Sequence, residues 1–107
     1  MPSVDALKKI IQQMPNDPFP RYGLAMELRR TKQHDEAKVA FAELAEKFPD
    51  YVAQYLMHAQ MLSELGDKPA AKSVVDKGIA AAKKKGDAHA AGELSALLGE
   101  LAASDDD

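Results

Sequence analysis

The chain has 107 residues, a formal net charge of −3 and 29% charged residues of both signs, which predicts a single domain with an ordinary solvated surface. This charge balance excludes the strongly basic surface that is typical of nucleic-acid binders. The sequence contains no Cys, which excludes disulfides, a thiol nucleophile and a cysteine-ligated metal site.

The first half of the chain predicts three helices. Apolar residues at helical spacing predict a helix over residues 4–14, with Ser3 as its N-terminal cap. A second helix is expected over residues 18–31, where Asp17 is positioned as the cap. A third is expected over residues 34–48.

The second half predicts three more helices. One is expected over residues 51–65, capped by Asp50 and closed by Gly66. The next runs from Asp67, its expected cap, to Lys85, and the last covers residues 87–103. The remaining acidic tail, residues 104–107, is expected to be disordered.

The chain also resembles itself from one block to the next. When residues 18–51 are set above residues 52–85, small and apolar positions coincide, and we call two residues paired in this way matching positions. Coinciding pairs are Ala25 and Ala59, Leu28 and Leu62, Ala37 and Ala71, and Phe41 and Val75. A fixed period in this range indicates a stacked helical repeat.

This pattern resembles the tetratricopeptide repeat family, which favours small and apolar residues at these places, with Pro49 at the end of the first block. The resemblance implies an all-α fold, a right-handed α-solenoid of antiparallel helix pairs with about six helices. It would form one domain over residues 1–103, with half-repeats at residues 3–14 and 87–103 around the two full repeats.

The two blocks depart from the family pattern at different places. The bulky residue expected early in the first helix is Tyr55 in the second block but Arg21 in the first. The turn Gly is present as Gly66 and replaced by Lys32. His58 stands where the family favours Leu, which predicts a partly buried packing residue.

The resemblance implies a non-catalytic scaffold or adaptor that binds a peptide or protein segment. In this family the first helices of successive repeats line a concave groove. The residues expected to face that groove are Phe19, Tyr22, Met26, Arg29, Arg30, Leu56, Met57, Gln60 and Glu64.

The expected groove is apolar at its centre and basic at one edge, through Arg29 and Arg30. Members of the family that bind chaperone C-termini hold a terminal carboxylate with Lys and Asn, whereas Tyr22, Met26 and Met57 stand at the corresponding places. A peptide with apolar anchors and an acidic flank therefore fits better. The alternative without a ligand is that these three side chains pack between neighbouring helix pairs.

Two further alternatives remain. Leu7, Ile10 and Ile11 are more apolar than a terminal helix needs, which favours self-assembly, such as a homodimer through the end helices. His89 and Glu93 share a helix face, but two ligands without a third make a weak metal signal. No phosphate-binding loop or nucleophile elbow is present, so we expect neither an enzyme nor a bound cofactor or metal.

The expected location is the cytoplasm, with no membrane partner. The first residues are amphipathic and contain no apolar run long enough for a signal peptide or a spanning helix.

Overall fold

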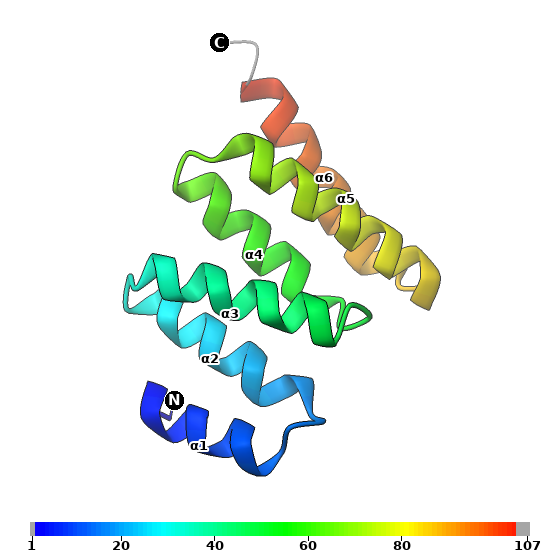
Figure 1. Ribbon diagram of the computed structural model, residues 1–107. Coiled ribbons are helices and arrows are strands. Elements are labelled where there is room, and N and C mark those ends of the chain that lie inside the picture. Colours follow the sequence, from blue (N-terminus) through cyan, green and yellow to red (C-terminus); the bar gives the residue numbers. More distant parts are fainter. Residues whose placement is uncertain (1, 105–107) are drawn as a thin grey trace. The chain divides into compact units, whose positions relative to one another are not determined.

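The computed structural model describes residues 2–104, and these form six α-helices with no strand among them (Figure 1). The helices are α1 (Val4–Gln13), α2 (Pro18–Arg30), α3 (His34–Lys47), α4 (Ala53–Glu64), α5 (Lys68–Lys85) and α6 (Ala88–Ser104). The all-α prediction is therefore confirmed. Ser104 belongs to α6, and the rest of the tail that we expected to be disordered lies outside the described residues.

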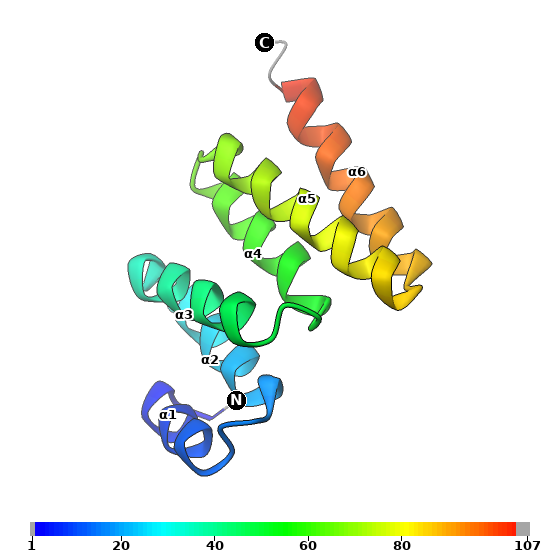
Figure 2. The same cartoon turned by 45° about the vertical axis from the view of Figure 1, so that its right-hand side comes forward.

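The chain divides into two compact units, Met1–Pro49 (unit 1) and Asp50–Asp107 (unit 2), and each is described by itself. In unit 1, α2 lies between α1 and α3 and packs against both, as two views show (Figures 1 and 2). In unit 2, α4, α5 and α6 each pack against the other two. The expectation of a single domain over residues 1–103 stays a prediction.

The core of unit 1 is built from small residues that let helices approach and larger residues that fill the space between them. Ala25 of α2 and Ala37 of α3 are completely buried, as are Phe41 and Leu44 of α3. Leu7 of α1 is 5% exposed, so the amphipathic first helix buries its apolar side.

Unit 2 has a larger apolar cluster shared by its three helices. Tyr55 and Ala59 of α4 pack with Ala71 and Val75 of α5 and with Leu94 of α6. The three helices thus enclose one continuous core.

Gly78 marks a close approach of helices in unit 2. A Cβ atom added at Gly78 would lie 2.5 Å from the Cβ of Tyr55 and 3.0 Å from Cδ1 of Leu94. Glycine is required there because any side chain would push α5 away from α4 and α6.

Three of the four N-terminal caps predicted from the sequence are confirmed. Ser3 Oγ accepts a hydrogen bond from the backbone N–H of Ala6 at 3.1 Å. Asp17 Oδ1 accepts one from Phe19 at 2.9 Å, and Asp67 Oδ1 accepts one from Ala70 at 3.2 Å. Each cap satisfies an N–H group that the helix itself leaves without a partner.

The prediction that Asp50 caps α4 is wrong. The helix begins at Ala53, and Val52 is its N-cap residue without a side-chain hydrogen bond. Gln54 Nε2 donates instead to the backbone carbonyl of Tyr51 at 3.0 Å, while Asp50 lies too far upstream. Asp50 pairs with Lys84 at 3.4 Å, a contact between two exposed side chains.

The turns after α2 and α4 have the same backbone form but different residues. Gly66 follows α4 with φ +83°, and Lys32, at the matching position of the first repeat, follows α2 with φ +60°. The residue after each turn donates a backbone hydrogen bond to a carbonyl of the preceding helix. Gln33 donates to Leu28 and Asp67 donates to Leu62, both at 2.9 Å. The left-handed turn is therefore a property of the repeat and not of glycine alone.

Candidate peptide-binding surface

Five of the predicted binding residues belong to α2, and the helix period of about 100° per residue puts them on one side of it. We call this set the α2 stripe: Phe19, Tyr22, Met26, Arg29 and Arg30. Phe19 is 67% exposed, which is unusual for a large aromatic side chain. Tyr22, Met26 and Arg29 are half-buried, and Arg30 is exposed. Unit 1 thus presents an aromatic residue and a thioether beside two cations.

The positive charge of Arg30 is held by a neighbouring carboxylate on the same helix. Arg30 Nε donates to both carboxylate oxygens of Glu27 at 3.1 Å, and a second guanidinium nitrogen also donates to Glu27. Glu27 is 5% exposed, and its hydrogen bonds from Arg30 hold the pKa of its carboxyl below the usual value. The predicted basic edge is therefore partly neutralised at Arg30.

Tyr22 lies deeper in the stripe than Phe19. Burial raises the pKa of its phenol, and the nearby positive charge of Arg29 works in the opposite direction. The hydroxyl therefore stays protonated at neutral pH. Tyr22 therefore adds a half-buried aromatic ring with a neutral hydroxyl group to the stripe.

The other four predicted residues lie on α4 in unit 2. Leu56, Met57 and Gln60 are half-buried, and Glu64 is exposed. Leu56 also packs against the apolar cluster of unit 2, so part of its side chain is used by the core. Helix period places the four on one side of α4, which we call the α4 stripe.

Sequence reasoning missed the burial of Glu27. A Glu in the middle of a helix is normally solvated, and the apolar pattern of α2 is too weak to predict which side faces the core. The available signal was its place in the repeat, because the matching position in the second block is Met61, which is 1% exposed.

His89 and Glu93, the weak candidate for a metal site, have no third ligand beside them in the described part of the chain. Nε2 of His89 lies 3.1 Å from Oε1 of Glu93, and both side chains are largely exposed. Within the described residues, no group of three or more His, Cys, Asp or Glu side chains could hold a metal ion. No described helix is both long enough and apolar enough to cross a membrane.

These features define a class of protein: an all-α assembly of repeated helix pairs. No family model and no curated protein matches the chain. Solved structures do match it. A tetratricopeptide repeat domain protein of Salinibacter ruber, in solution, is 31% identical with a TM-score of 0.76, over 81% of this chain and 88% of that one. Its crystal structure is 30% identical with a TM-score of 0.74, over 81% and 97% of the two chains.

The chain therefore belongs to the tetratricopeptide repeat family. A more distant structure has the same fold: the TPR2B domain of yeast Sti1, in a complex with pHsp70, at 20% identity and a TM-score of 0.84, over 94% of this chain and 81% of that one. The family resemblance predicted from the repeat period is confirmed.

Proposed function

We propose that this chain is a protein-interaction module in which the first helices of the two repeats, α2 and α4, contact a peptide or protein segment of a partner. Membership of the tetratricopeptide repeat family supports an interaction module rather than an enzyme. The TPR2B domain of Sti1, which shares the fold, is in a complex with pHsp70, a precedent for a protein ligand on such a helical array.

One observation carries the proposal: Phe19 is 67% exposed on the α2 stripe, beside the half-buried Tyr22 and Met26. An aromatic ring and a thioether supply large, adaptable apolar contact for a peptide side chain. The two cations at one edge of the α2 stripe, Arg29 and Arg30, supply attraction for an acidic flank, although Glu27 partly neutralises Arg30.

The test is capture of partners on the immobilised full chain. Phe19→Ala and Met57→Ala each remove an apolar contact from one stripe, and we expect both to lose a partner that the wild type retains. Met14→Ala is the matched control, because Met14 is 47% exposed and caps the C-terminal end of α1, outside both stripes. Circular dichroism checks that helicity is unchanged. A partner that is retained by both stripe variants contradicts the proposal.

The alternative is self-assembly through an end helix. Met14 at the end of α1 is exposed, and Ile10 and Ile11 are only half-buried, which favours α1 over α6, where Leu94, Leu97 and Leu101 are all buried. Sedimentation over a wide concentration range decides this alternative. A dimer that Met14→Ala dissociates would support it, and a monomer at all concentrations would remove it.

A further inference from the structure

Unit 1 contains a cleft that the proposed peptide contact does not use. It has a volume of about 350 Å³, which falls at the lower end of the range for ligand pockets. It lies over α2 and between α1 and α3, whose backbones make no close contact in the described part of unit 1. We call it the α1–α3 cleft. Its apolar lining is formed by Leu24, Leu28, Val39 and Ala40.

The α1–α3 cleft and the α2 stripe lie on opposite sides of α2. Leu24 and Leu28 follow Phe19 by five and nine residues, which at about 100° per residue turns them about 140° and 180° away from it. A substitution in the cleft can therefore change one surface and leave the other intact.

Val39 is the most exposed part of the apolar lining. It is 57% exposed in the middle of α3, and Ser73 stands at the matching position of α5. Packing of the helix pair thus does not require an apolar residue at this position. Val39 offers a contact that the fold itself leaves unused.

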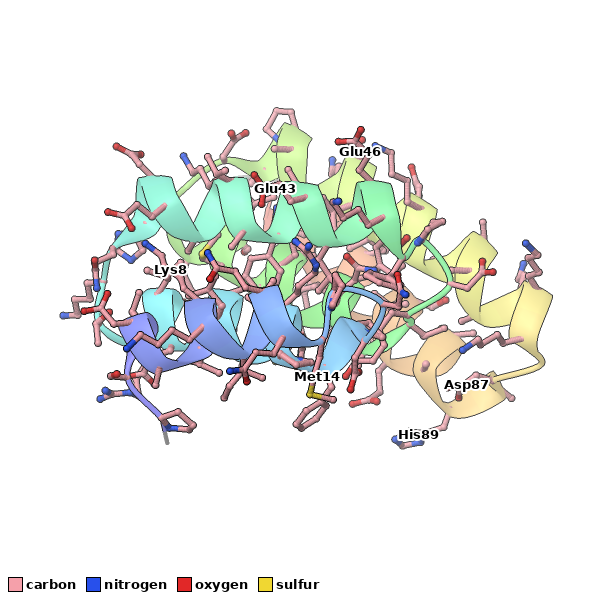
Figure 3. All side chains as sticks on the ribbon, turned by 60° about the horizontal axis from the view of Figure 1, so that its bottom comes forward. Lys8, Met14, Glu43, Glu46, Asp87 and His89 are labelled. Carbon is pink, nitrogen blue, oxygen red and sulfur yellow. The ribbon has the colours of Figure 1, made fainter. Side chains whose placement is uncertain are left out.

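The polar lining of the cleft is mostly acidic. Asp35, Glu36 and Glu43 of α3 line it, together with Lys8 of α1. Figure 3 shows Lys8 between α1 and α3, and Glu43 on the α3 side.

The second repeat lacks these acids. Asp35, Glu36 and Glu43 are replaced at the matching positions by Pro69, Ala70 and Lys77. An apolar floor with carboxylates along one wall is therefore a property of unit 1 and not of the repeat. Such a wall is complementary to a basic ligand.

We propose that the α1–α3 cleft docks a basic amphipathic helix of a partner protein. Asp35, Val39 and Glu43 are spaced four residues apart along α3, so they span about 12 Å of the cleft. A partner helix presents its own side chains at the same spacing, with apolar anchors on one side and Lys or Arg beside them. The anchors contact Val39 and the Leu floor, and the cations pair with the carboxylates of α3.

The probe is a synthetic amphipathic helical peptide of Leu and Lys, titrated into the ¹⁵N-labelled full chain. We expect amide shifts to change around the cleft, at Lys8, Leu24 and residues 35–43, and not along the α2 stripe. A peptide with the same Leu pattern and Glu in place of every Lys is expected not to bind, because the acidic wall repels it. Shifts that follow the α2 stripe, or equal binding of the Glu peptide, would overturn the proposal.

The decisive variants give unit 1 the residues that unit 2 already has. Val39→Ser and Glu43→Lys copy Ser73 and Lys77, so both are compatible with the repeat. We expect the double variant to weaken binding of the Leu/Lys peptide by about tenfold or more, through loss of an apolar anchor and of one ion pair.

Glu46→Lys is the charge-matched control, because Glu46 is exposed on the same helix and does not line the cleft (Figure 3). It changes the net charge by the same amount as Glu43→Lys and should leave binding almost unchanged. If both charge reversals weakened binding of the Leu/Lys peptide equally, the peptide would be attracted by the overall negative charge and not by the cleft, and the proposal would be overturned. Concentration-dependent shifts of the cleft residues without peptide would do so too, by assigning the cleft to a second copy of the chain.

Discussion

The two units use the same helix pair but complete it differently. In unit 1, α2 has a helix on each side, and the outer two, α1 and α3, leave a cleft between them. In unit 2, α4, α5 and α6 all pack against one another around a single apolar cluster. The difference shows that the repeat pattern fixes the helix pair, while the third helix decides whether the neighbouring apolar surface is enclosed or left as an open cleft.

The residues that differ between the repeats follow this division. Leu44 of α3 is fully buried, and its matching position in α5 is Gly78, which admits no side chain because Tyr55 and Leu94 occupy the space. Unit 2 therefore replaces side-chain packing by direct approach of helices at this place.

The largest effect is expected when that close approach is prevented. Gly78→Ala should lower the free energy of unfolding by about 2–3 kcal/mol, because the new methyl group overlaps Tyr55 Cβ, which cannot move without its helix. Gly92→Ala on α6 meets nothing within 4 Å and should raise stability by up to about 1 kcal/mol through helix propensity. Urea unfolding of both variants measures this. If the two substitutions changed the free energy of unfolding equally, the close contact at Gly78 would not be what prevents a side chain there.

A smaller effect is expected from His58, which stands in unit 2 where unit 1 has Leu24. Burial, assisted by the positive charge of Lys77, lowers the pKa of His58 from 6.5 to about 4. The folded state thus favours neutral imidazole, and its full stability is present above pH 6.5. As the pH falls from 6.5 towards 4, the unfolded chain binds a proton that the folded chain does not, and stability is lost.

His58→Leu, which copies Leu24, removes this titration. Between pH 7 and pH 5 the wild type should lose about 1–2 kcal/mol more stability than the variant, less than the limit of about 1.4 kcal/mol per pH unit because the ring is partly solvated. Urea unfolding at the two pH values gives the comparison. Parallel losses in both proteins would mean that His58 is solvated in the folded state.

Most of the fold could be predicted from the sequence because its signals are local. Ser3, Asp17 and Asp67 precede helical patterns and do cap them. The prediction that Asp50 caps α4 was wrong because an Asp in a turn cannot be distinguished from a capping Asp until the first helical residue is known.

The candidate surfaces could be predicted only in part. The helix period places Phe19 on the same side of α2 as Tyr22 and Met26, and the match of Phe41 with Val75 indicates a packing position. How far each side chain is exposed depends on what packs nearby, which the sequence does not give. The α1–α3 cleft was missed because a single Val on a solvated helix is an ordinary feature. The cleft can be recognised only in the structure, where residues of α1, α2 and α3 are seen to surround it.

The smallest expected effect concerns the turns, where the repeats share a conformation and differ in residue. Lys32 has φ +60°, a region that costs a residue with a Cβ about 1 kcal/mol, whereas Gly66 enters it freely. Lys32→Gly should therefore raise stability by about 0.5–1 kcal/mol and the Tm by about 3–6 °C. The reverse change, Gly66→Lys, should lower stability by a similar amount, and thermal unfolding measures both. If both changes destabilise, the Lys32 side chain stabilises its turn by more than the backbone strain costs, and the two turns are not equivalent.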